Sequence, residues 1–213
     1  AEPMSDAANH GQLMDDVYRY QRLFYDLTRK YYLLGRDHLI SEMRVQPGQT
    51  VLEVACGTGR NLMAIKRKYP GAEIYGLDIS EQMLMTARAK LGATARLEQA
   101  DACDFDPSRM FGVTGFDHIV LSYSLSMIPD WIAALDEATR HLSMNGSLHI
   151  VDFGDFSGLP SWFDRGLHGW LARFHVTPRK ALPETLERRA MNARAFHQRD
   201  LYRGYAYYAR IHK

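Results

Sequence analysis

Short apolar runs alternate with amphipathic stretches between residues 50 and 153, and this alternation constrains the fold more than any other feature of the sequence. Five runs have the length and the residue types of buried strands: 50–54, 73–77, 95–99, 118–122 and 147–153. Three stretches between them have the period of a helix: 60–69, 81–91 and 130–143. Strands and helices that alternate in this way form a parallel sheet with helices on both faces.

Two of these helices have predictable ends. Ser80 can cap the helix over 81–91, because a serine side chain accepts a hydrogen bond from the first turn. Asn145 and Gly146 are expected to end the helix over 130–143, because both residue types tolerate the left-handed backbone that follows a helix.

The sequence on either side of this region lacks the alternation. Residues 12–40 predict a helix, since apolar side chains recur every three or four positions, and Gly35 is expected to break or bend it. Residues 154–180 are rich in Gly, Trp, Phe, His and Arg and have no clear period. A short helix is expected over 183–194, and a closing strand over 204–211.

These observations predict one α/β domain rather than two domains. The domain is expected to span residues 45–213, with an irregular cap formed by an insertion at about 154–200. The N-terminal helical segment, 1–44, is expected to contribute to the same cap.

Composition narrows the class of protein further. The chain has 213 residues and a formal net charge of +1, so no overall field attracts it to nucleic acid. Cys56 and Cys103 have the spacing of neither a zinc site nor a disulfide framework, and we expect no bound metal. No apolar run of about 18 residues and no signal peptide is recognisable, so a cytoplasmic location is expected.

Two glycines follow the first strand, in the sequence VLEVACGTGRN over 51–61. A strand, a glycine-rich turn and a helix place backbone N–H groups and a helix N-terminus around a ligand. Gly57 and Gly59 are not followed by the third glycine of a dinucleotide site, and the Gly-Lys-Ser/Thr sequence of a P-loop is missing. The turn is therefore expected to admit a flat or carboxylate-bearing small molecule.

Acidic residues follow the next two strands. Asp78 lies about 20 residues beyond the glycines, where a carboxylate can bind both hydroxyls of a ribose. Asp101 follows the strand over 95–99 and can reach an adenine amino group, because the carboxyl ends of neighbouring parallel strands meet in one crevice.

Four motifs carry a resemblance to a known family. They are EVACGTG (53–59), DI (78–79), DA (101–102) and FDHIV (116–120). Together they resemble the motifs of class I S-adenosylmethionine-dependent methyltransferases, and the resemblance covers roughly residues 45–153. It implies a Rossmann-like domain with a mostly parallel seven-stranded sheet, whose last strand is antiparallel, and S-adenosylmethionine as the cofactor.

The resemblance also implies which residues bind the cofactor. These are Glu53, Ala55, Gly57, Gly59, Asp78, Ile79, Met83, Asp101, Ala102 and Ser122. Asp78 would bind the ribose, with Ile79 and Met83 against the adenine. Glu53 would orient the glycine turn through hydrogen bonds.

The remaining residues of this set have roles at the two ends of the cofactor. Asp101 and Ala102 would contact adenine N6 and N1. Gly57 and Gly59 would lie against the methionyl part, and Ser122 would face the sulfonium.

The N-terminal segment bears on the methyl acceptor. The sequence YDLTRKYYLLGRD (25–37) is similar to the N-terminal segment of bacterial betaine-lipid synthases of the methyltransferase type, and DFGD (152–155) and FHVTPR (174–179) resemble the same family. This similarity implies trimethylation of the amino group of diacylglyceryl-homoserine. Methyltransferases for phosphatidylethanolamine, or for a small amine, phenol or quinone precursor, share parts of the pattern. A non-catalytic cofactor-binding module is disfavoured, because the glycine turn and the ribose acid are intact.

Candidate acceptor-site residues follow from the chemistry of methyl transfer to an amine. As methyl groups accumulate, the nitrogen becomes a bulky cation that binds aromatic faces. We expect Tyr25, Tyr32 and Tyr123 to line the acceptor end, although the same tyrosines could simply pack the first helix against the sheet. Asp152 could orient the ammonium and accept its proton, or could be only a capping carboxylate.

Three further residues are candidates for binding the acceptor. His175 could accept a proton, and Arg36 and Arg179 are among the arginines that could hold a head-group carboxylate. The segment from 151 to the end has 11 Lys+Arg against 6 Asp+Glu, interleaved with Trp and Phe. That pattern suits peripheral contact with an anionic membrane surface, and equally suits a solvated face.

Overall fold

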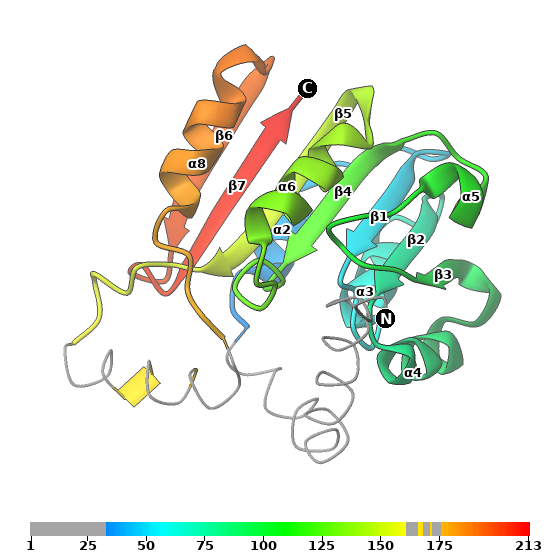
Figure 1. Ribbon diagram of the computed structural model, residues 1–213, viewed down its shortest axis with the longest axis horizontal. Coiled ribbons are helices and arrows are strands. Elements are labelled where there is room, and N and C mark those ends of the chain that lie inside the picture. The colour runs from blue at the N-terminus through cyan, green and yellow to red at the C-terminus, as the bar shows by residue number, and fades with distance from the viewer. Residues whose placement is uncertain (1–32, 161–165, 168–170, 172–175) are drawn as a thin grey trace, which may run out of the picture.

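The computed structural model describes residues 33–160, 166, 167, 171 and 176–213. Its core is a seven-stranded sheet in the order β3-β2-β1-β4-β5-β7-β6 (Figure 1). The strands are β1 (Thr50–Val54), β2 (Glu73–Asp78), β3 (Ala95–Gln99), β4 (Phe116–Ser122), β5 (Leu142–Phe153), β6 (Ala195–Leu201) and β7 (Ala206–His212). Strands β1 to β5 are parallel to one another, whereas β7 is antiparallel to both β5 and β6. The predicted mostly parallel sheet with a final antiparallel strand is confirmed.

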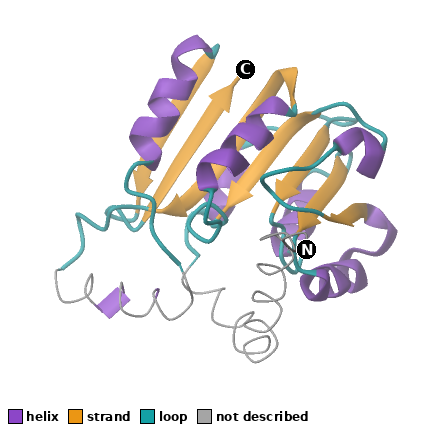
Figure 2. Cartoon of the chain, viewed as in Figure 1, coloured by secondary structure: helices purple, strands orange, loops and turns teal. Residues whose placement is uncertain are grey.

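Helices cover both faces of this sheet (Figure 2). They are α2 (Arg36–Glu42), α3 (Arg60–Lys68), α4 (Glu81–Leu91), α5 (Pro107–Phe111), α6 (Trp131–Arg140) and α8 (Leu182–Arg189), with short 3-10 turns η1 (Gly92–Thr94) and η2 (Ala190–Asn192). Buried residues of α2, α3 and α4 form one core cluster with the sheet, and those of α5, α6 and α8 form a second. The Ser80 side chain accepts a hydrogen bond from the Met83 N–H, as its capping role predicts.

The end of α6 differs from the sequence prediction. The helix ends at Arg140, and Asn145 and Gly146 already belong to β5. A Cβ at Gly146 would lie 2.9 Å from the Phe116 carbonyl oxygen, so this glycine allows β5 to approach β4 closely. The expectation that Asn145 and Gly146 end the helix is therefore wrong, because a close strand contact, and not a helix end, requires the glycine.

The predicted cap region also contains part of the sheet. The expectation of an irregular insertion with one helix over 154–200 is incomplete, because β6 (Ala195–Leu201) is an edge strand of the sheet and is paired along its length with β7. Four consecutive β6 residues, from His197 to Asp200, are exposed, so the strand shows no alternation of apolar and polar side chains. The first part of the helix expected over 12–40 lies outside the described residues, while Gly35, with φ 87°, is the N-cap of α2.

Within the described part of the chain, no helix has the length and apolar content needed to cross a bilayer.

Candidate functional site

The carboxyl ends of β1 and β4 lie side by side in the middle of the sheet, at the point where the strand order reverses. Open α/β sheets bind ligands at this point. Two residues there have a left-handed backbone without being glycine: Ala55 follows β1 with φ 56°, and Tyr123 follows β4 with φ 54°. Such strained residues gather at functional sites, where the surrounding structure compensates for their cost.

The two glycines after β1 have different structural roles. Gly57 has φ 54° and lines a cavity, and its N–H donates to Asp78 Oδ2 at 2.7 Å. Gly59 has φ 72° and is the N-cap of α3, where an added Cβ would lie 2.7 Å from Leu91 Cδ1 and 3.1 Å from Ala87 Cβ. Gly59 therefore lets α3 pack closely on α4, and its contact with the cofactor stays a prediction.

Asp78 stabilises the glycine turn from the end of β2. The carboxylate is buried, with Oδ2 accepting from Gly57 N–H and Oδ1 accepting from Ser80 N–H at 2.9 Å. It thus joins the glycine turn to the start of α4. A carboxylate oxygen can accept a second hydrogen bond, so these bonds leave the predicted ribose contact possible.

A narrow cavity of about 40 Å³ lies beside the glycine turn. Its lining residues are Leu33, Arg36, Glu53, Ala55, Cys56, Gly57, Thr58, Arg60, Asn61 and Ser122. Glu53 Oε1 accepts a hydrogen bond from Asn61 Nδ2 at 2.7 Å, so Glu53 holds the start of α3 beside the turn. With two guanidinium groups and one carboxylate, the cavity carries charges complementary to those of an amino acid group.

A larger cavity of about 430 Å³ lies on the other side of Ala55, which lines both. Its lining residues are Ala55, Leu77, Ile79, Ala100, Asp101, Ala102, Cys103, Ile128, Pro129 and Asp130. Apolar side chains with acidic groups among them suit a flat base whose amino group needs a hydrogen-bond acceptor. Met83, also predicted to contact the adenine, is buried and is not among the lining residues.

Asp101 and the two cysteines complete this part of the site. Asp101 Oδ1 accepts from Cys103 N–H at 2.8 Å. Burial, followed by the nearby Asp101 and Asp130 carboxylates, raises the pKa of Cys103 to about 12. Burial also raises the pKa of Cys56 well above its usual value. Both thiols are neutral near pH 7, which leaves neither of them activated as a nucleophile.

Tyr123 connects the end of β4 to the N-terminal segment. Its hydroxyl donates to the Leu34 carbonyl oxygen at 2.5 Å, and its ring packs edge-on against Phe153. Burial raises the pKa of Tyr123 well above its usual value, so the hydroxyl keeps its proton. The ring is buried and lines none of the cavities described here, so its role at the acceptor end stays a prediction.

Asp152 lies near the end of β5 and is also buried. Its Oδ2 accepts from Ser126 N–H at 3.0 Å, and its Oδ1 accepts from Phe153 N–H at 2.8 Å. Burial raises the pKa of Asp152 to about 6, against the lowering effect of these hydrogen bonds and of Arg179. The carboxylate therefore holds the loop after β4, and its predicted contact with the acceptor is not tested by these bonds.

The remaining predicted acceptor residues fall into two groups. Tyr25, Tyr32 and His175 lie outside the described residues, as do the aromatic side chains at 162, 163, 170 and 174. Arg36 lines the narrow cavity, and Arg179 donates to backbone carbonyls of the loop after β4.

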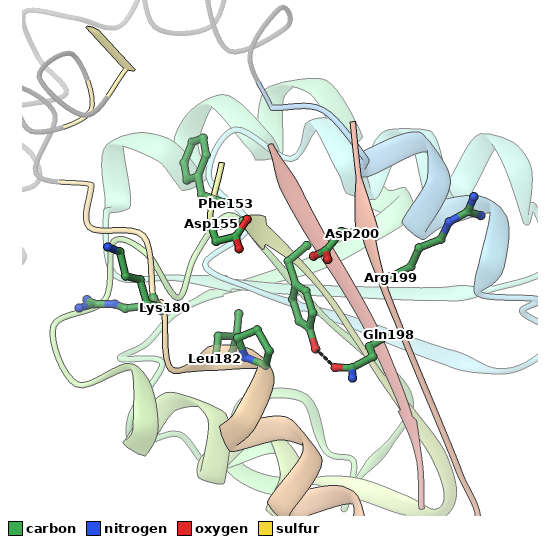
Figure 3. A pocket seen from close by; sticks show the side chains of 11 residues that line it. Phe153, Asp155, Lys180, Leu182, Gln198, Arg199 and Asp200 are labelled. Carbon is green, nitrogen blue, oxygen red and sulfur yellow. Dashed lines mark hydrogen bonds between the residues drawn. The ribbon is translucent and has the colours of Figure 1, made fainter. Parts of the chain in front are cut away.

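A third cavity, of about 410 Å³, was missed by the sequence analysis (Figure 3). It lies between β5, β7, β6 and the segment that leads into α8, and Lys180 lies across it from Gln198 and Asp200. Tyr207 of β7 donates its hydroxyl hydrogen to Gln198 Oε1. The sequence pattern does not reveal this cavity, because the cavity requires β6, whose exposed polar residues show no strand alternation.

Comparison with known proteins agrees with the methyltransferase resemblance of the sequence motifs. Residues 51–146 match a family model described as a methyltransferase domain. A demethylmenaquinone methyltransferase of Staphylococcus epidermidis is 32% identical over 136 residues, which are 63% of this chain and 55% of that protein. One of Listeria monocytogenes is 30% identical over 145 residues, 67% of this chain and 60% of that protein. The match thus covers less than two thirds of either relative.

Solved structures share the fold over most of this chain. The plantazolicin methyltransferase BamL, solved in complex with a triazolic desmethylPZN analog and SAH, has a TM-score of 0.71 and 16% identity, covering 97% of this chain and 96% of that chain. A Thermotoga maritima S-adenosylmethionine-dependent methyltransferase, described as a possible histamine N-methyltransferase, has a TM-score of 0.68 and 17% identity, covering 93% and 99%. The chain therefore has the fold of these methyltransferases, and residues 51–146 of it match the methyltransferase-domain family.

Proposed function

We propose that this protein transfers the methyl group of S-adenosylmethionine to a small-molecule acceptor, with a quinone-type ring as the first candidate. The observation that carries the proposal is the pair of cavities that meet at Ala55: a narrow charged one and a larger, mainly apolar one. A nucleoside joined to an amino acid has one part suited to each. The two relatives named as demethylmenaquinone methyltransferases support the acceptor class.

The described residues suit the parts of the cofactor as follows. Arg36 and Arg60 would hold its carboxylate, since a guanidinium binds a carboxylate in a bidentate manner. Ile79 and Ala102 would lie against the base, and Asp101 would accept from its amino group. Gly57 presents bare backbone between these regions.

The cofactor supplies an activated methyl group on a sulfonium, and the protein aligns that group with the acceptor atom. Tyr123 keeps its proton near pH 7, which excludes its hydroxyl as the base that removes a proton from the acceptor. Its hydroxyl instead ties the end of β4 to Leu34, so it fixes the backbone at the sulfonium end. Asp152 fixes the same loop through Ser126 N–H.

A lipid head-group amine is the second acceptor. The sequence similarity to betaine-lipid synthases favours a lipid amine as the acceptor. The named relatives favour the quinone-type ring, which is why the ring is proposed first. The two acceptors make different demands on the protein, because a lipid amine needs contact with a bilayer surface and a ring needs only a cavity.

The test is transfer of labelled methyl from S-adenosylmethionine by the purified protein. Separate reactions contain a short-chain demethylnaphthoquinol, a small phenol, or diacylglyceryl-homoserine in vesicles. The proposal predicts labelled product with the ring compounds and no dependence on vesicles. Label found only in the lipid amine would reverse the order of the two acceptors.

Asp101→Ala tests whether the activity uses this site. Loss of one charge-assisted hydrogen bond should raise the KM for S-adenosylmethionine about tenfold. Asp106→Ala is the control, since Asp106 caps α5 and lines neither cavity of the proposed cofactor site. An equal KM in the two variants would remove Asp101 from the site.

A further inference from the structure

The loop between β4 and α6 is tied down at several points on its buried side. Ser126 N–H donates to Asp152 Oδ2 at 3.0 Å, and the Ser126 carbonyl oxygen accepts from Thr177 N–H at 2.8 Å. Leu125 and Ser126 are fully buried. This loop is therefore fixed between the end of β5 and the segment that leads into α8, which runs beside it (Figure 1).

Arg179 makes two further bonds to the same loop. Its Nε donates to the Leu125 carbonyl oxygen at 2.9 Å, and its Nη2 donates to the Ile128 carbonyl oxygen at 2.7 Å. Hydrogen bonds from a charged donor are stronger than those between neutral groups. The planar guanidinium fixes the spacing of two carbonyls three residues apart, which the single charged nitrogen of a lysine does not do.

The far end of this loop forms one wall of the larger cavity. Ile128, Pro129 and Asp130 line it, together with Ala100, Asp101 and Ala102. The Asp130 carbonyl oxygen accepts a hydrogen bond from Cys103 Sγ at 3.4 Å, which joins this loop to the lining segment after β3. The position of Ile128 therefore helps to determine the width of the cavity.

We propose that Arg179 is a positioning residue, which sets the affinity for the nucleoside part of the cofactor by holding Ile128 and Pro129 at the cavity wall. The inference rests on the proposed function, since it takes the larger cavity as the nucleoside site. It differs from the expectation that Arg179 holds a carboxylate of the acceptor. A residue that binds the acceptor changes the acceptor KM, whereas a residue that positions this wall changes the Kd of the nucleoside.

The experiment measures binding by calorimetry for two ligands, S-adenosylhomocysteine and 5′-methylthioadenosine, which lacks the amino acid group. Arg179→Met should weaken both ligands by the same factor, about tenfold, and Arg179→Lys by a smaller common factor. Arg189→Met is the matched control: Arg189 donates two hydrogen bonds to Asp136 through Nε and Nη2, but lines neither cavity. Its affinities should equal those of the unmodified protein.

Each other outcome has a defined meaning. Unchanged affinities in both Arg179 variants, or weakening of S-adenosylhomocysteine alone, would overturn the positioning role. If Arg179→Met fails to fold, Arg179→Lys decides the question by the same comparison with Arg189→Lys. If the unmodified protein binds neither ligand, the proposed function fails first, and that result is distinct from a specific failure of the Arg179 variants.

Discussion

Gly57 and Gly59 are two residues apart, and both have a left-handed backbone, yet they answer to different constraints. Gly57 lies at a cavity and bonds to Asp78, whereas Gly59 lies where α3 and α4 approach each other. The glycine motif in the sequence does not distinguish a glycine needed at a cavity from a glycine needed for helix packing. At the scale of single residues, then, the nature of the constraint depends on contacts that lie far away in the sequence.

Gly59→Ala should destabilise the protein more than Gly112→Ala. Both glycines have φ 72°, but a Cβ at Gly59 would lie 2.7 Å from Leu91 Cδ1, and a Cβ at Gly112 would have nothing within 4 Å. Backbone strain should cost each variant about 1 kcal/mol, and crowding should add about 1–2 kcal/mol at Gly59. Urea unfolding of both variants measures the difference, and equal losses of unfolding free energy would contradict the packing role.

Two adjacent strands of the sheet share a buried histidine pair. His118 of β4 and His149 of β5 are stacked, with His118 Nδ1 3.1 Å from His149 Nε2 and His118 Nε2 3.0 Å from Gln49 Oε1. Burial lowers the pKa of His118 to about 4, with Asp117 opposing this effect. Burial, together with His118, lowers the pKa of His149 well below its usual value. Both rings are therefore neutral in the folded protein near pH 7.

This pair should make the protein less stable in mild acid. The unfolded chain binds a proton at each histidine near pH 6.5, whereas the folded chain does not, so stability is fully present above that pH. It is lost as the pH falls from about 6.5 to about 4, by up to about 3 kcal/mol for His118. Unfolding free energy measured at several pH values should show this slope.

His118→Gln should reduce the slope, because the new side chain does not titrate. His197→Gln is the control, since His197 is exposed on the edge strand β6. A slope in His118→Gln that equals the slope of the unmodified protein would assign the pH dependence to other groups.

Sequence patterns predict the buried elements of this chain better than its edge. Strands β1, β2 and β4 lie between other strands and are mostly buried, and their apolar runs identify them. The edge strand β6 carries exposed polar residues and was missed, as was the five-residue helix α5 (Pro107–Phe111). The length of a short or exposed element is set by its neighbours, and those neighbours are not visible in a local pattern.

The same limit applies to the site. One cavity at the carboxyl ends of the parallel strands is lined by Ala55, Ile79, Asp101 and Ala102. The sequence predicts that these residues lie together, because neighbouring parallel strands end side by side. The hydrogen bonds of Arg179 to the loop after β4 join residues about 50 positions apart. Sequence spacing cannot predict contacts between such distant residues. Tyr25, Tyr32 and His175, which are predicted to lie at the acceptor end, are outside the described residues, so their roles stay predictions.

At the scale of the whole molecule, the described residues form cavities at three places along the sheet. Two meet at Ala55 in the centre, and the third lies at the β5–β7–β6 side. The central pair lies where the strand order reverses, which is where such folds bind nucleotides. The proposed binding of S-adenosylmethionine depends on these two cavities, whereas the identity of the methyl acceptor does not follow from them.

Calorimetric titration of the purified protein with S-adenosylhomocysteine tests this central claim most directly. The account predicts a saturable isotherm with one site per chain, and a clear loss of affinity in Asp101→Ala but not in Asp106→Ala. No heat of binding with S-adenosylhomocysteine, together with a saturable isotherm for NAD, would contradict it.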